Sequence, residues 1–151
     1  MEIEPIGVIH SPFKTGEEAP HQPIASNSIG RIEIFKEYEE GLSDIEGFSH
    51  IILIFAFHRS EGYSLKVKTP HDENLKGVFA TRSPNRPNRL GLSIVRLLTR
   101  EKNILFVEGI DAIDGTPLID IKPYVPNLEP KTGIRIGWLE GKIEKKVVPH
   151  F

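Results

Sequence analysis

The sequence contains no cysteine, and this absence excludes several kinds of functional site. A disulfide scaffold, a thiolate zinc site, an iron–sulfur cluster and a cysteine nucleophile all require that residue. The six histidines are scattered, without an H-x-H pair or an H-E-x-x-H motif, so we expect no metal site. A chain without disulfides fits a reducing compartment, and we expect a cytoplasmic protein.

Long apolar runs and glycine-rich nucleotide motifs are also missing. No apolar run has the length of a membrane span, and the N-terminal stretch MEIEPIGVIHSPF lacks the apolar region of a signal peptide, so we expect no membrane contact. No G-x-G-x-x-G motif, P-loop or G-x-S-x-G motif is present. A nucleotide-like cofactor would therefore be held outside a Rossmann or Walker cradle.

Thirteen glycines and twelve prolines divide the chain into short β-rich runs. Such runs between turn residues predict an all-β sandwich or barrel. Gly7 and Gly30 predict bends or bulges, Asp114-Gly115 predicts a tight turn, and one short helix is expected at Lys36–Leu42. The expected strands cover residues 3–10, 29–35, 49–58, 77–81, 92–99, 103–111, 116–124 and 133–139.

Charge is distributed unevenly, although the formal net charge is only −2. The segment from Asn74 to Arg100 contains no acid and six basic residues. This pattern indicates a specific anionic partner, and the alternative is a solvated basic face.

The stretch FATRSPNRPNRLGLS (79–93) presents Arg82, Arg86 and Arg89 on one segment. Pro84 and Pro87 prevent a regular helix there, so the arginines are carried by a stiff, irregular loop. Guanidinium groups bind phosphate or carboxylate through paired hydrogen bonds. The loop is therefore a candidate anion site, and the alternative is a loop held together by arginine–carbonyl bonds.

Two further segments are candidates. In LIDIKPYVP (118–126), Asp120, Lys122 and Tyr124 alternate with other residues and would share one face of an extended segment. The alternative is an exposed edge strand. The pair His58-Arg59 follows a long apolar run, at the point where a strand is expected to leave the core.

Several of these segments together resemble the TsaA-like family, whose characterised members are TrmO-type tRNA N6-methyltransferases. The resemblance rests on IGVIHSPFK, GRIEIF, LSDIEGFSHIILIFAFHRS, GVFATRSPNRPNRLGLSIVRLL and DGTPLIDIKPYVP, and runs from about residue 6 to 126. It implies a single-sheeted β-barrel over 1–126, with 127–151 as a short C-terminal extension packed on or near the barrel.

The resemblance also implies an activity and a site. The cofactor would be S-adenosylmethionine, bound near the contact of a homodimer, and the reaction would methylate N6 of N6-threonylcarbamoyladenosine at position 37 of tRNA. The implied cofactor contacts are Pro20, His21, Gln22, His58, Arg59, Arg82, Leu92, Asp120, Ile121, Lys122 and Pro123. The implied substrate contacts are Arg86, Asn88, Arg89 and Tyr124.

The proposed chemistry requires a proton acceptor. The N6 nitrogen is urea-like and a poor nucleophile while protonated, so a base or a stabilising positive charge is needed. Arginine stays charged, which leaves Asp120 and His58 as possible bases and Arg82 as a catalytic cation. The alternative function is a barrel that binds S-adenosylmethionine or RNA without turnover.

Overall fold

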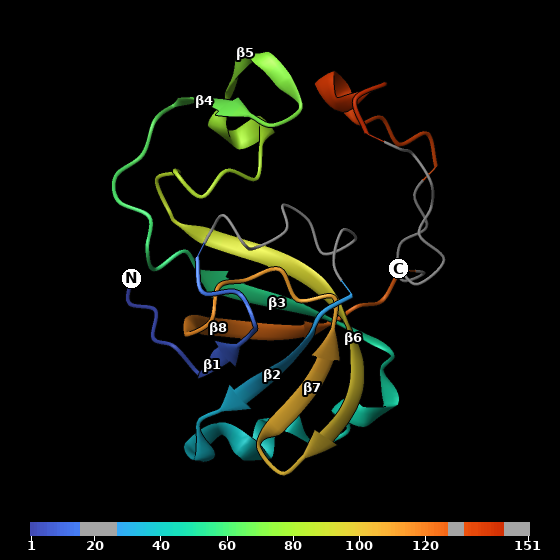
Figure 1. Cartoon of the computed structure of the whole chain (residues 1–151). Coiled ribbons are helices and arrows are strands. Elements are labelled where there is room, and N and C mark those ends of the chain that lie inside the picture. The colour runs from blue at the N-terminus through green and yellow to red at the C-terminus, as the bar shows by residue number, and fades with distance from the viewer. Residues whose placement is uncertain (16–26, 127–131, 144–151) are drawn as a thin grey trace.

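The computed structural model describes residues 1–15, 27–126 and 132–143. Six strands close into an antiparallel barrel in the order β1-β2-β7-β6-β3-β8, and β4 and β5 form a separate two-stranded sheet (Figure 1). The single-sheeted β-barrel expected from the sequence is confirmed. The barrel strands are β1 (Gly7–His10), β2 (Ile29–Ile34), β3 (His50–Ala56), β6 (Leu90–Glu101), β7 (Ile104–Glu108) and β8 (Thr116–Pro123).

Alternation of side chains along the strands builds the core. In β3, Ile51, Leu53 and Phe55 are buried inside the barrel, whereas Ile52 and Ile54 between them are only partly buried. Successive residues of a strand point to opposite faces of the sheet, which explains this pattern. Inward residues from all six barrel strands join one apolar cluster.

Two 3-10 helices, η2 (Lys36–Leu42) and η3 (Ile45–Gly47), lie at one end of the barrel, below the strands in Figure 1. The short helix expected at this position is therefore present, as 3-10 turns. Leu42 is buried in the core cluster and attaches η2 to the barrel.

Two of the expected strands are wrong. Residue 77 is instead the last residue of β5 (Asp72–Gly77), and the 3-10 helix η4 (Val78–Ala80) follows directly. The stretch 133–139 contains η5 (Gly137–Leu139). Gly133 and Gly137 have φ angles of 68° and 58°, a left-handed backbone conformation that is incompatible with a continuous strand.

The hairpin of β4 (Lys66–Thr69) and β5 has no counterpart among the expected strands. Its sequence is polar, and Val67 is the one buried residue within its two strands, so apolar alternation does not reveal it. Residues 132–143 pack against this region. Trp138 Nε1 donates to the Ala80 carbonyl at 2.9 Å, and the Lys76 ammonium lies 5.2 Å from the centre of the Trp138 ring. The division into a barrel domain and a C-terminal extension stays a prediction.

The irregularities in the pairing of the barrel strands lie at positions other than Gly7 and Gly30. Register shifts occur between Ile54 and Phe55 in the β3–β8 pair and between Leu97 and Thr99 in the β6–β7 pair. Gly7 instead permits close approach, since a Cβ there would overlap the carbonyl oxygen of Glu33. The expected turn at Asp114-Gly115 is confirmed by the structure.

Candidate functional site

Three neighbouring barrel strands carry part of the expected cofactor site. Ile54 of β3 pairs with Leu92 of β6 on one side and with Asp120 of β8 on the other. Directly paired residues share one face of a sheet, so these three side chains form a row. The row faces outward, because Leu53 and Ser93, which precede and follow it on their strands, are fully buried. Strand pairing thus brings Leu92 and Asp120 to the same wall of the barrel.

The Asp120 carboxylate has two observed partners. Lys122 Nζ lies 2.9 Å from Asp120 Oδ2, and the Ile121 amide donates to Asp120 Oδ1 at 2.9 Å. The Asp120 and Lys122 side chains are 44% and 60% exposed, so both groups remain accessible to a ligand. Tyr124 follows the strand, where its amide donates to the His50 carbonyl at 3.2 Å. The pairing of Asp120 and Lys122 confirms the expected shared face of these two residues.

The edge-strand alternative for this segment is wrong. β8 lies within the closed sheet, between β1 and β3. Asp120, Ile121, Lys122 and Pro123 all pair with β3. The polar side chains therefore stand on a barrel wall whose backbone is held in register.

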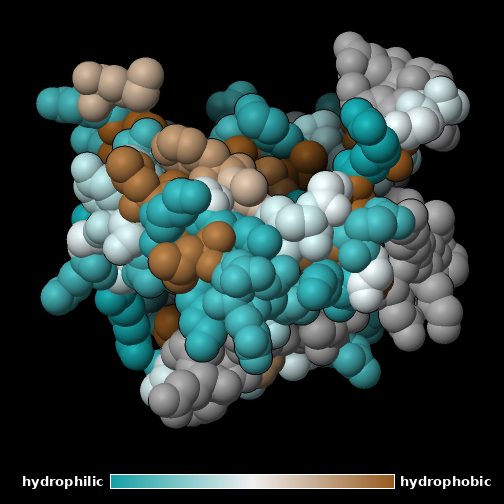
Figure 2. Space-filling view, turned by 90° about the horizontal axis from the view of Figure 1, so that it is seen from above, coloured by the Kyte–Doolittle hydropathy of each residue, from teal (hydrophilic) through white to brown (hydrophobic). Residues whose placement is uncertain are grey.

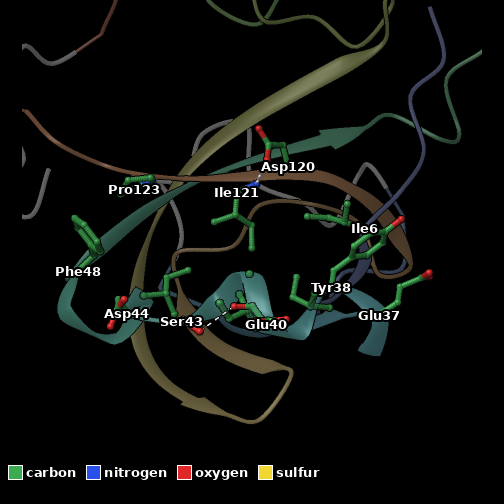
Figure 3. Close-up of a pocket in the computed structure, with 14 residues that line it drawn as sticks. Ile6, Glu37, Tyr38, Glu40, Ser43, Asp44, Phe48, Asp120, Ile121 and Pro123 are labelled. Atoms are coloured by element: carbon green, nitrogen blue, oxygen red, sulfur yellow. Dashed lines mark hydrogen bonds between the residues drawn. The ribbon is translucent and has the colours of Figure 1, made fainter.

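A groove of about 740 Å³ lies on the other side of β8, between the barrel end and η2 and η3. Figure 3 shows Ile121 pointing into this groove while the Asp120 carboxylate points away from it. Apolar residues such as Ile34, Leu42 and Ile121 form part of its lining. Glu37, Glu40 and Asp44 add carboxylates, which suit a cationic ligand more than an anionic one.

The loop after η4 is held in shape by one of its own arginines. Arg86 Nη1 donates to the Thr81 carbonyl at 2.9 Å and to the Ser83 carbonyl at 3.1 Å. This is the arginine–carbonyl arrangement that the sequence left open as an alternative. A guanidinium has five N–H donors, so the bonds at Nη1 leave other donors of the group for a ligand. The substrate role of Arg86 stays a prediction.

Similar bonds hold the loop after β3. Arg89 Nη1, from the loop before β6, donates to the Ser60 carbonyl at 2.7 Å, and Arg59 Nη1 donates to the carbonyl of Lys14, after β1, at 2.7 Å. The exposed residues His58, Arg59, Arg82, Asn88 and Arg89 all belong to the loop after β3 or to the loop before β6. Figure 2, which views the molecule from above, shows apolar and hydrophilic side chains interleaved on this face. The structure thus gathers the basic candidates at one end of the barrel.

One titratable residue at this end was not among the candidates from the sequence. Asp111 follows β7, and Ser93 Oγ of β6 donates to Asp111 Oδ1 at 2.5 Å. Burial raises the pKa of Asp111 to about 6, against smaller opposing effects of the Ser93 hydrogen bond, its own backbone amide and the positive charge of Arg82. In the sequence, the feature that could have indicated this site is Ser93, the polar residue among the inward positions of β6.

Three of the expected cofactor contacts, Pro20, His21 and Gln22, lie outside the residues that the structure describes. Among the described residues, no three His, Asp or Glu side chains gather closely enough to hold a metal ion. In the described part of the chain, no helix has the length and hydrophobicity that a membrane span requires.

The comparison with protein families decides where this barrel belongs. The family model of the tRNA-methyltransferase O N-terminal domain matches residues 8–129, which includes every barrel strand except the first residue of β1. The chain belongs to the TrmO family. The resemblance seen in the sequence motifs is therefore confirmed.

Solved structures of TrmO share the architecture. The crystal structure of TrmO from Pseudomonas aeruginosa superposes with a TM-score of 0.76 at 37% identity, over 91% of this chain and 62% of that one. A second crystal structure of TrmO gives a TM-score of 0.77 at 39% identity. This chain therefore spans less than two thirds of the TrmO chains that it matches.

Two relatives in the family carry informative names. A probable S-adenosyl-L-methionine-binding protein of Pyrococcus abyssi is 53% identical over 142 residues, which cover 93% of this chain and 77% of the relative. The tRNA (adenine(37)-N6)-methyltransferase of Rattus norvegicus is 42% identical over 143 residues, covering 85% of this chain and 33% of the relative. The family thus includes proteins named for cofactor binding and proteins named for methyl transfer to tRNA.

Proposed function

We propose that this chain is an S-adenosylmethionine-dependent tRNA methyltransferase that modifies N6 of N6-threonylcarbamoyladenosine at position 37. Family membership and the name of the rat relative support methyl transfer to tRNA. The name of the Pyrococcus relative supports the cofactor. The threonylcarbamoyl group is the finer part of the proposal and rests on the family resemblance of the sequence motifs.

The single observation that carries the proposal is the outward row of Leu92, Ile54 and Asp120. Its residues fit the cofactor chemically. The exposed Leu92 side chain offers an apolar surface to an adenine ring, and the Asp120 carboxylate offers acceptors to hydroxyl or ammonium groups. When bound, the cofactor supplies an electrophilic methyl group on a sulfonium sulfur.

The basic loops have a separate role in the proposal. Arg86, Asn88 and Arg89 bind the threonyl carboxylate and the phosphates of the anticodon arm, together with Tyr124 beyond β8. Arginine suits both anions because its planar fork matches their oxygens. The bonds from Arg86 and Arg89 to backbone carbonyls support this role, because a loop held in shape loses less entropy when it binds.

The homodimer is also a proposal. The outer face of β3 and β6 exposes an apolar surface that includes Leu90 and Leu92, 37% and 44% exposed, next to the partly buried Ile52 and Ile54. A second copy covering this face would bring its own loops close to the Asp120 row. Sedimentation over a range of concentrations tests this, with Leu90→Lys expected to shift the protein to monomer. A cytoplasmic location stays a prediction that cell fractionation checks.

The deciding experiment measures transfer of a labelled methyl group from S-adenosylmethionine to tRNA. Transcripts with and without the threonylcarbamoyl group are compared, and the product nucleoside is identified by mass spectrometry. We expect label only in the modified tRNA, on N6. Label in both tRNAs would contradict the proposed substrate but not the methyltransferase activity.

The second candidate is a barrel that binds S-adenosylmethionine or RNA without turnover. The name of the Pyrococcus relative, which states binding only, favours it. Calorimetric titration with the cofactor in the same preparation separates the two candidates. Tight binding without any transfer to either tRNA would establish the binding protein and exclude the enzyme.

A further inference from the structure

Two exposed aromatic side chains border the loop of residues 81–89, which we call the arginine loop. Phe79 of η4, next to the β4–β5 hairpin above the barrel in Figure 1, is 77% exposed. Tyr63, in the segment before β4, is 60% exposed. Burial of a large ring is favourable, so a ring left in solvent is a candidate for contact with a partner. Neither ring has a role in the function proposed above.

The backbone is fixed on both sides of Phe79. Before it, Val78 is buried, and its amide donates to the Leu65 carbonyl at 2.9 Å. After it, the Ala80 carbonyl accepts a hydrogen bond from Trp138 Nε1 at 2.9 Å. A ring on a fixed backbone loses less conformational entropy when it binds than a ring on a mobile segment. The C-terminal segment that carries Trp138 therefore helps to hold Phe79 in place.

Hydrogen bonds join both aromatic segments to the arginine loop. The amide of Ser64, the residue after Tyr63, donates to the Asn85 carbonyl at 3.4 Å. Arg86 Nη1 donates to the carbonyl of Thr81, which directly follows η4, at 2.9 Å. The segments that carry the two rings thus adjoin the loop that carries the candidate phosphate contacts.

The charge of this region is complementary to that of a nucleic acid. From Asn74 to Arg100 the chain has six basic residues and no acid. Asp72, at the start of β5, is paired with two lysine ammonium groups at 3.5 and 3.7 Å, which offset its charge. Glu61 and Glu73 are exposed acids on the flanking segments. Exposed rings beside a cluster of basic side chains are typical of sites for single-stranded nucleic acids.

We propose that Phe79 and Tyr63 stack on unpaired bases of RNA while the arginine loop holds the adjoining phosphates. This inference rests on the proposed function, in which the target base lies at position 37, within the unpaired anticodon loop of tRNA. Aromatic side chains bind unpaired bases through the faces of both rings, with little sequence preference. A duplex keeps its bases stacked inside the helix and offers no such face. The surface therefore distinguishes a looped RNA from a duplex.

The deciding experiment titrates the protein, without cofactor, with two RNA probes. One probe is the stem and loop of a tRNA anticodon arm, and the other is a duplex with the same number of phosphates. We expect Phe79→Leu to weaken binding of the stem-loop about tenfold and to leave duplex binding unchanged, because leucine is apolar but has no aromatic face. Tyr63→Leu should act in the same direction, and Phe79→Trp should keep the wild-type affinity.

Leu75→Ala is the matched control, because Leu75 is a similarly exposed apolar residue on β5, at 59%. It should bind both probes as the wild type does. Wild-type affinity of Phe79→Leu for the stem-loop would overturn the proposal. An equal loss for stem-loop and duplex, or an equal loss in Leu75→Ala, would also overturn it, because neither result depends on stacking. Thermal unfolding of each variant checks that the fold is retained.

A second copy of this chain is another partner that an exposed ring could contact. Sedimentation of the wild type and of Phe79→Leu, without RNA, tests this alternative. The proposal predicts the same oligomeric state for both proteins. A shift of Phe79→Leu toward monomer would assign the ring to a contact between copies and overturn the stacking role.

The RNA surface and the proposed function fail in distinguishable ways. If the wild type binds the stem-loop through Phe79 but transfers no methyl group to tRNA, the methyltransferase is refuted and the RNA surface stands. If the wild type methylates tRNA while Phe79→Leu binds the stem-loop with unchanged affinity, only the stacking role is refuted.

Discussion

Gly91 of β6 and Phe55 of β3 are paired across the sheet, and the Phe55 ring fills the space that a side chain at position 91 would need. A Cβ at Gly91 would lie 2.7 Å from Phe55 Cζ and 2.8 Å from Phe57 Cζ. The two rings contact each other edge to face, with centroids 5.5 Å apart. The glycine therefore allows an aromatic pair to pack at the start of the strand that carries Leu92 and Ser93.

This contact predicts the effect of Gly91→Ala. The added methyl group must displace a buried ring, and overpacking of this kind costs about 1–3 kcal/mol of unfolding free energy. Urea unfolding measures the change, with Gly47→Ala as control because a Cβ at Gly47 meets no atom within 4 Å. Equal destabilisation by both substitutions would show that the Phe55 contact is not the cause.

Asp120→Asn tests the outward row. We expect the affinity for S-adenosylmethionine to fall about tenfold or more, as for the loss of a hydrogen bond to a charged group. Stability should change by less than about 1 kcal/mol, because the Asp120–Lys122 pair is largely exposed. Calorimetry and thermal unfolding measure the two effects, with Glu101→Gln as a surface control. An unchanged cofactor affinity would remove Asp120 from the site.

Arg89→Gln tests the contact with tRNA phosphates. Each neutralised phosphate contributes to the dependence of affinity on salt, so loss of one contact should reduce the slope of log K against log salt by about 0.7–0.9. Binding titrations at several salt concentrations measure the slope. Arg31→Gln, on the exposed face of β2, is the matched control. If Arg89→Gln and the control have the wild-type slope, Arg89 serves only to hold the Ser60 carbonyl.

The raised pKa of Asp111 predicts a dependence of stability on pH. Well below pH 3.8 the carboxyl group is protonated in both states, and its contribution to stability is fully present. Between pH 3.8 and about 6 the unfolded chain loses the proton first, so stability falls as pH rises. The loss is complete well above pH 6 and amounts to about 3 kcal/mol.

Asp111→Asn lacks this titration, so its unfolding free energy should fall less than that of the wild type across this window. Urea unfolding at a series of pH values measures both proteins. Asp114 has the opposite sign, because its hydrogen bonds to Lys14 and Ser11 lower its pKa, so its contribution is lost only as the pH falls below the usual carboxyl range. Parallel pH curves for the wild type and Asp111→Asn would contradict the burial of a titrating Asp111.

The predictability of each element followed from how its residues are buried. Strands such as β3 could be predicted because their residues form a continuous apolar run between turn residues, and this run is visible in the sequence. The β4–β5 hairpin left no such trace, since Val67 is its one buried strand residue. The stretch 77–81 is apolar enough for a strand, yet Val78 is buried from a 3-10 helix instead. Burial of a single residue does not specify the local backbone.

The sequence by itself determined that the chain is all-β, that it carries a stiff basic loop, and that it has the motifs of its family. These properties depend on local composition and spacing. Only the tertiary structure decided which side chains meet, because antiparallel pairing around the closed barrel sets the register. That register aligns Leu92 with Asp120 across Ile54. Pairing of the consecutive strands β6 and β7 brings Asp111 to Ser93, and burial raises the pKa of this carboxyl.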